Sequence, residues 1–129
     1  MVTTRTSIVA LALAVLVMAS CAHLQPDADP VLVRAEQTLV VSFETVDAFL
    51  RIEHANQAAL EALVPGSHQL AEQLRVKAPA SFRALDAAIA AYRTNRSPEN
   101  KATVLTWLAV CEQLAHDAQV LLAAWGGGR

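Results

Sequence analysis

The sequence has little of what β-rich or disordered proteins need. Among its 129 residues are four glycines and five prolines, and aromatic residues make up 5%. Sandwiches and barrels need frequent turns and strands rich in β-branched and aromatic residues, so this composition argues against both. Charged residues are also few, at 17%, whereas 54% of the chain is apolar. This composition excludes a disordered chain that is expanded by repulsion between its charges. We therefore expect one helical domain.

The chain also lacks a strong charge of one sign and a long apolar run. Its formal net charge is −2, so no general basic surface indicates nucleic acid as a partner. The longest apolar run, Ile8 to Met18, has eleven residues, far short of the ~20 that a permanent transmembrane helix needs. The sequence has neither a glycine-rich phosphate loop nor a Gly-x-Ser-x-Gly elbow. We therefore expect neither an enzyme nor a bound cofactor.

The first twenty-one residues follow the plan of a secretory signal. Arg5 gives a positive start, the apolar run follows, and small residues precede Cys21. This segment resembles the lipobox of bacterial lipoproteins through the residues Val17-Met18-Ala19-Ser20-Cys21, although Met18 stands where Leu, Val or Ile is usual. The resemblance implies that residues 1–20 are a signal peptide, that cleavage occurs before Cys21, and that Cys21 is lipidated.

Two alternatives to lipidation are also compatible with this segment. Ordinary signal peptidase could cut after Ala22 and release a soluble protein, or the segment could stay as an uncleaved anchor. Because Ala22 rather than Asp follows Cys21, the resemblance implies the periplasmic side of the outer membrane if the cell is Gram-negative. A lipid on Cys21 leaves Cys111 without a disulfide partner, so we expect a free thiol there.

The mature chain predicts three helices. After a linker over residues 21–29, Asp29-Pro30 combines an N-cap with a proline at the first helical position. Pro65-Gly66 marks a turn, and Ser97-Pro98 repeats the helix-start signal. The expected helices span about 30–64, 67–95 and 98–125, followed by a flexible tail over 126–129. Pro79 lies inside the second helix and should kink or interrupt it.

Each helix carries an apolar stripe with steps of three and four residues, and short turns make successive helices antiparallel. The sequence thus predicts an all-α, up-down-up three-helix bundle over residues 30–125. Charge favours pairing of the first two helices, since residues 27–64 hold seven acids and two bases and residues 67–101 hold three acids and six bases. The expected core residues are Leu39, Phe43, Val46, Leu50, Leu60 and Val64, then Leu70, Leu74, Ala78, Phe82, Leu85, Ile89 and Tyr92, then Val104, Trp107, Cys111, Leu114, Ala118, Leu121 and Trp125.

Two polar residues, Glu53 and Gln57, interrupt the stripe of the first helix. In the commoner arrangement, the helix face rotates at this point and both side chains reach water. Alternatively, they form a polar layer in the core near Pro79, with Arg75 or Lys77 as the partner. A third interpretation is a docking surface for another protein or for a second copy.

Metal binding is a weaker hypothesis. If the helices fold back in simple register, residue 53 lies opposite about 78, and 78 opposite about 115. Glu53, His54, Glu112 and His116 would then lie at one level, and carboxylate and imidazole groups are usable metal ligands. Di-iron bundles, however, use four helices and Glu-x-x-His pairs, which this chain lacks. We therefore expect no metal site and keep these four residues only as weak candidates.

These features favour a membrane-anchored bacterial lipoprotein whose helical bundle is a protein-interaction or envelope-structural module. Its expected partners are the membrane, through the lipid on Cys21, and an unidentified envelope protein. Trp125 is the candidate partner-binding residue, because shielding is thin at the last helical turn. The alternative is a ligand- or metal-binding bundle in the periplasm. The mature domain resembles the many small helical lipoproteins of bacteria whose roles are uncharacterised.

Overall fold

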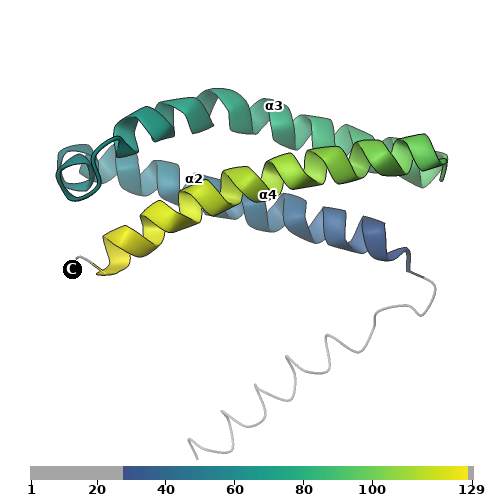
Figure 1. Cartoon of the computed structure of the whole chain (residues 1–129), viewed down its shortest axis with the longest axis horizontal. Coiled ribbons are helices and arrows are strands. Elements are labelled where there is room, and N and C mark those ends of the chain that lie inside the picture. The colour runs from purple at the N-terminus through teal and green to yellow at the C-terminus, as the bar shows by residue number, and fades with distance from the viewer. Residues whose placement is uncertain (1–27, 128–129) are drawn as a thin grey trace, which may run out of the picture.

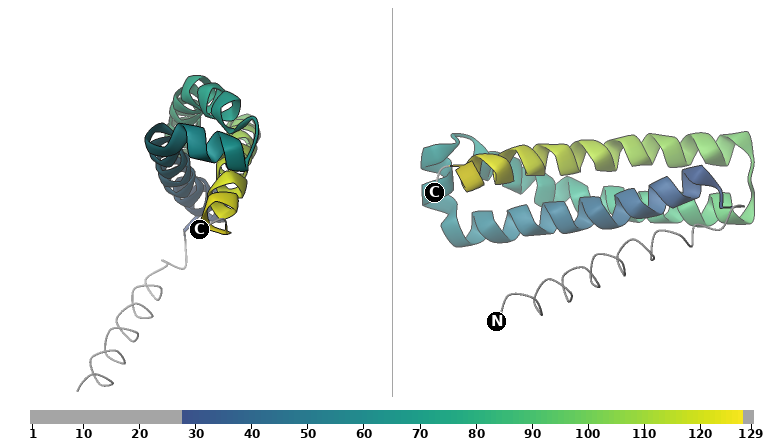
Figure 2. Two further views of the ribbon diagram at one scale, coloured as in Figure 1. Left: turned by 90° about the vertical axis from the view of Figure 1, so that its left-hand side faces the viewer. Right: turned by 90° about the horizontal axis from the view of Figure 1, so that it is seen from below.

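Three long helices make up the part of the chain that the computed structural model describes, residues 28–127 (Figure 1). They are α2 (Pro30–Leu63), α3 (Ser67–Thr94) and α4 (Pro98–Gly127). Successive helices run in opposite directions and each packs against both others, so that they surround one core (Figure 2). The expected three-helix bundle is confirmed. The predicted signal peptide, Cys21 and the end of the predicted tail lie outside the described residues. None of the three helices is long and apolar enough to cross a membrane.

The start of α2 is fixed by Asp29, as the sequence predicts. Its Oδ1 atom accepts hydrogen bonds from the amides of Val31, at 2.8 Å, and Leu32, at 3.4 Å. Its Oδ2 atom accepts from the Tyr92 hydroxyl at 3.0 Å and from Arg96 at 2.5 Å. Partial burial raises the pKa of Asp29, but these hydrogen bonds and the charge of Arg96 outweigh burial and lower it. One side chain therefore caps α2 and ties it to the end of α3.

The final turns of α2 depart from the prediction of one regular helix. Asn56 has φ −135° and ψ 27°, which lie outside the helical region. Its side-chain amide donates to the carbonyl of Ile52 at 3.0 Å, a local hydrogen bond of the kind that competes with the helical backbone. α2 is therefore broken at Asn56, and residues 57–63 form a short terminal segment.

Of the two outcomes expected at Pro79, a kink or an interruption, the interruption is wrong, because α3 continues to Thr94 as one helix that arches along its length (Figure 1). The end predicted for the third helix also needs correction. α4 does not end at Trp125, since it continues through Gly127. The first two glycines of the predicted tail are thus helical, because they follow a long, well-packed helix that outweighs their low helix propensity.

The core consists of two apolar clusters, one toward each end of the bundle. The apolar stripes predicted for α3 and α4 largely face these two clusters. The stripe predicted for α2 is wrong at one large residue. Phe43 is 57% exposed, whereas Phe49 is fully buried. The buried face of α2 includes the polar residues Ser42 and Glu53. A prediction from the spacing of apolar residues alone therefore assigned the buried face to a neighbouring side of the helix. The buried apolar residues are Leu32, Ala35, Leu85, Ala88, Ile89, Tyr92, Val104, Leu108 and Cys111 in one cluster, and Val46, Phe49, Leu60, Ala71, Leu74, Ala78, Leu114, Ala118 and Leu121 in the other.

Cys111 is a free and fully buried cysteine, as expected. Its thiol donates to the carbonyl of Ser81, with 3.7 Å between Sγ and oxygen, and burial raises its pKa to about 11. Because thiolates are the reactive form, we expect a water-soluble thiol reagent to modify Cys111 slowly in the native protein and quickly in urea. Rapid modification of the native protein at this position would contradict its place in the core.

Candidate functional site

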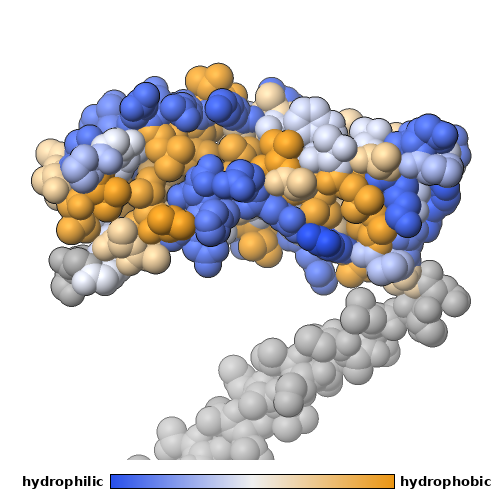
Figure 3. Space-filling view, viewed as in Figure 1, coloured by the Kyte–Doolittle hydropathy of each residue, from blue (hydrophilic) through white to orange (hydrophobic). Residues whose placement is uncertain are grey.

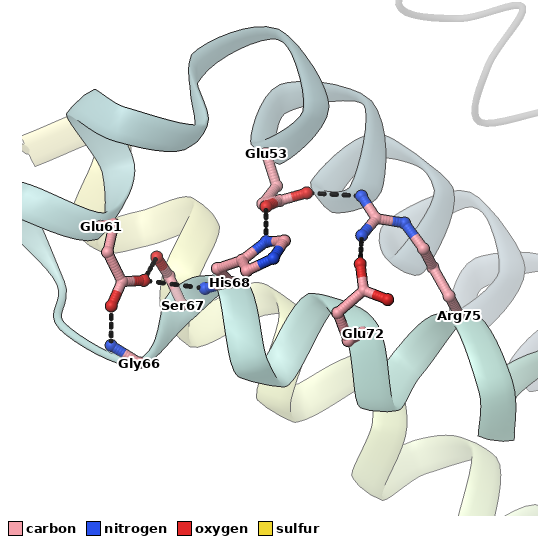
Figure 4. A network of polar contacts seen from close by, with 7 residues as sticks. All are labelled: Glu53, Glu61, Gly66, Ser67, His68, Glu72 and Arg75. Atoms are coloured by element: carbon pink, nitrogen blue, oxygen red, sulfur yellow. Dashed lines mark hydrogen bonds and ion pairs between the residues drawn. The ribbon is translucent and has the colours of Figure 1, made fainter.

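The carboxylate of Glu53 is buried where α2 contacts α3. The residue is 1% exposed, yet its side chain is ionisable. Oε1 lies 2.7 Å from Nδ1 of His68, and Oε2 accepts a hydrogen bond from Arg75 at 2.5 Å (Figure 4). Arg75 also donates to Glu72. Since His68 and Arg75 both belong to α3, the Glu53 carboxylate joins the two helices.

This arrangement decides between the interpretations of the interrupted stripe. A polar layer with Arg75 as the partner is confirmed for Glu53, and the interpretation in which Glu53 reaches water is wrong. Gln57, in contrast, is exposed, and so is Lys77. The sequence argument did not identify His68, the second partner of Glu53.

The network holds Glu53 in its ionised form. Burial raises the pKa of the Glu53 carboxyl, but the hydrogen bonds and charges of His68 and Arg75 outweigh burial and lower the pKa from its ordinary value. The hydrogen bond to Glu53 raises the pKa of Arg75 in turn, against the opposing effect of burial. The two groups therefore stabilise each other as ions.

A second carboxylate of α2, Glu61, caps the start of α3. The cap position is Gly66, whose φ of 89° suits glycine but leaves no side chain to accept from the free amides. Glu61 accepts instead from the Gly66 amide at 2.7 Å, and from the Ser67 hydroxyl and the His68 amide at 2.9 Å each (Figure 4). The amides of His68 and Gly66, followed by the Ser67 hydroxyl, lower its pKa.

An apolar groove lies beside this network, between α2 and α3. Its volume is about 260 Å³, and its polar lining residues are Asp47 and Arg75. Phe43 and Phe82 meet edge to face there, with ring centroids 5.9 Å apart. The apolar lining residues are Phe43, Val46, Leu50, Leu74, Ala78, Pro79 and Phe82.

Exposed apolar side chains extend from the groove along α2. Val40 is 57% exposed, Val41 58% and Phe43 57%, and we call these three residues the α2 patch. On the face shown in Figure 3, apolar groups also reach the surface toward both ends of the bundle, and a band of polar residues lies between these two areas. The α4 residues Leu105, Val110 and Val120 are each at least 36% exposed. The described bundle thus leaves more than one apolar area uncovered.

The four weak metal candidates do not come together. Glu53 is held by His68 and Arg75, while His54 and His116 are exposed. Glu112 pairs with Arg34 at 2.7 Å, nineteen residues before Glu53 on α2. α4 crosses α2 at an angle (Figure 1), so the assumption of parallel, level helices failed. Within residues 28–127, no group of three or more His, Cys, Asp or Glu side chains is placed to hold a metal ion.

Trp125 is half-buried and packs against the core cluster that contains Leu60 and Leu121. Its ring therefore closes the end of the core farthest from the start of α2. Its role as a contact for a partner stays a prediction.

The comparisons with known proteins give no relative. No protein-family model matches the chain, and neither a curated protein nor a solved structure matches it significantly.

The carboxylates predict how stability depends on pH. Glu53 and Glu61 have pKa values below their ordinary value of 4.5 in the folded protein, so the unfolded chain takes up their protons first. Their contribution is complete above pH 4.5 and is lost as the pH falls through the lower, folded-state values. We expect the free energy of unfolding in urea to be smaller at about pH 3.5 than at pH 7. The loss should shrink in the variant Glu53→Gln, and an equal loss there would exclude Glu53 as a source.

Proposed function

We propose that this protein is a membrane-anchored bacterial lipoprotein whose helical bundle acts as a protein-interaction or envelope-structural module. The lipobox-like residues ending at Cys21 support the anchor. The α2 patch carries the interaction part of the proposal, because Val40 and Phe43 are neighbours on one helix face and are each more than half exposed. Adjacent exposed apolar groups next to a groove are typical of surfaces that bind another protein.

The size of the groove favours a partner protein over a small ligand. Pockets that enclose small molecules usually measure about 300–1,000 Å³, whereas this groove measures about 260 Å³ and is open to solvent. It suits one or two apolar side chains of a partner. The alternative of a ligand carrier is therefore less well supported than that of an interaction module.

The proposed anchor and the α2–α3 turn would lie at opposite ends of the bundle. Eight residues separate Cys21 from Pro30, so at most about 32 Å of extended chain joins the lipid to α2. The α3–α4 turn is at the same end, since Arg96 bonds to Asp29. Arg93 is paired with Glu36 of α2, and Arg96 with Asp29, the N-cap of that helix. The lipid is therefore the main proposed contact with the membrane.

The anchor is tested by the variant Cys21→Ser. We expect the wild-type protein to incorporate labelled palmitate and to sediment with membranes, and the variant to do neither, because several acyl chains are needed for stable anchoring. The matched control is Cys111→Ala, which removes the other cysteine and should leave both readouts unchanged. A wild-type protein that never incorporates palmitate would overturn the lipoprotein proposal.

The interaction module is tested by photo-crosslinking in native membranes. A photoreactive residue at Val40 should give a discrete crosslinked product that mass spectrometry identifies as an envelope protein. The same residue at Ala87, which is exposed on α3, serves as the control and should not give that product. The change Phe43→Ala should weaken the Val40 product. Identical products from both positions, or none from Val40, would contradict binding through the α2 patch.

A further inference from the structure

We infer that residues 57–64, at the end of α2, form a flap that opens as a unit while the rest of the bundle stays folded. The flap lies at the end of the bundle opposite the start of α2 (Figure 1). The inference does not depend on the proposed function, because local opening is a property of the chain itself.

The flap is bounded by two pivots. At its start, Asn56 already has non-helical dihedral angles, so a swing at this point costs little regular helical hydrogen bonding. At its end, Gly66 has φ 89°, a conformation that glycine leaves and enters without the steric cost of a side chain. A short helical segment between two such points can move as a rigid body.

Little apolar burial holds the flap in place. Between Asn56 and Gly66 only Leu60 is buried, at 1% exposure. Val64 is half-buried against the same cluster, whereas most other residues of the flap face solvent, including Leu63, which is 46% exposed. The earlier part of α2, in contrast, contributes six buried residues, namely Leu32, Ala35, Ser42, Val46, Phe49 and Glu53. Segments with few buried contacts open at the lowest free-energy cost.

The two carboxylates of the network lie on different sides of the hinge. Glu53 precedes Asn56, so its bonds to His68 and Arg75 hold the start of α3 to the fixed part of the bundle. Glu61 follows Asn56, and its bonds to Ser67 and His68 are the side-chain contacts that fasten the flap to α3, beside one backbone hydrogen bond from the Ser67 amide to the Val64 carbonyl (Figure 4). Glu61 is thus a latch that can be released without disturbing Glu53.

Opening would expose an apolar slot at the far end of the core. Leu60 belongs to the cluster that contains Ala71 and Leu121, with Trp125 packed against it. When the flap swings away, the place of the Leu60 side chain becomes open to solvent. In the closed state, Leu60 fills this slot itself.

Hydrogen exchange measured by mass spectrometry tests the flap on the full-length protein in detergent micelles. We expect the amides of residues 58–64 to exchange at least about tenfold faster than those of residues 42–53. Glu61→Gln should speed exchange in the flap by about a further tenfold, because charged hydrogen bonds are lost. The matched control, Glu44→Gln, changes an exposed acid of α2 before the hinge and should leave exchange unchanged throughout.

A second variant tests the pivot separately from the latch. Asn56→Ala favours a continuous helix and should slow exchange in the flap. Three results would overturn the inference: a flap as protected as residues 42–53 in the wild type, an increase in Glu61→Gln that is equal in all three helices, or faster exchange in Asn56→Ala.

Discussion

Replacing Arg75 with alanine will lower the free energy of unfolding by about 2–4 kcal/mol, because it removes one partner of a buried carboxylate. The cost is below that for a fully buried ion pair, since the Arg75 side chain is 33% exposed. The change leaves the Glu53 carboxylate, which is 1% exposed, with only His68 of its two observed partners. A small domain is stable by only about 5–15 kcal/mol, so the variant should unfold at a much lower urea concentration. Urea titration at pH 7, followed by far-ultraviolet circular dichroism, measures the loss.

Two controls separate the buried charge from the loss of any arginine. Arg83→Ala removes an exposed arginine of the same helix and should change stability by less than about 0.5 kcal/mol. The double variant of Glu53→Leu with Arg75→Leu should recover most of the loss, because apolar pairs often replace buried ion pairs without cost. If Arg75→Ala costs no more than Arg83→Ala, the carboxylate is not buried as described.

Two phenylalanines of α2 give the second large prediction. Phe49→Ala should cost about 3–5 kcal/mol, since the side chain is fully buried and its removal leaves a cavity. Phe43→Ala should cost less than about 1 kcal/mol, because Phe43 is 57% exposed and loses mainly its edge contact with Phe82. Urea titration of both variants under identical conditions compares them. Equal costs would mean that the buried face of α2 is assigned wrongly.

The ends of the helices could be predicted because local chemistry sets them. Asp29-Pro30, Pro65-Gly66 and Ser97-Pro98 placed the starts of all three helices and the ends of α2 and α3 within one residue of the structure, whereas the end of α4 lies two residues beyond the one expected. The break at Asn56 could not be predicted in this way, since single asparagines occur inside many regular helices. The break depends on how the end of α2 packs against the other helices. Local sequence does not show which residues become neighbours in the folded protein.

The candidate site was predictable only in part. Arg75 was identified as a partner because it lies across the first turn at nearly the expected register. His68 was not, because the break at Asn56 and the left-handed Gly66 together set where α3 begins relative to Glu53. The apolar pattern failed on α2 for a related reason: Ser42 and Glu53 occupy its buried face, and a search for apolar spacing skips such positions.

The Glu53–Arg75 pair also restricts how the helices can slide past each other. Apolar seams tolerate displacement, because one leucine can replace another in the same gap. A displacement of α3 by one helical turn, about 5.4 Å, would carry Arg75 out of reach of the Glu53 carboxylate and leave its charge unpaired in the core. Misaligned bundles of this sequence would therefore be raised in free energy well above the native alignment. A single ionic contact in the core thus selects one alignment of α2 and α3 among those that their apolar surfaces permit.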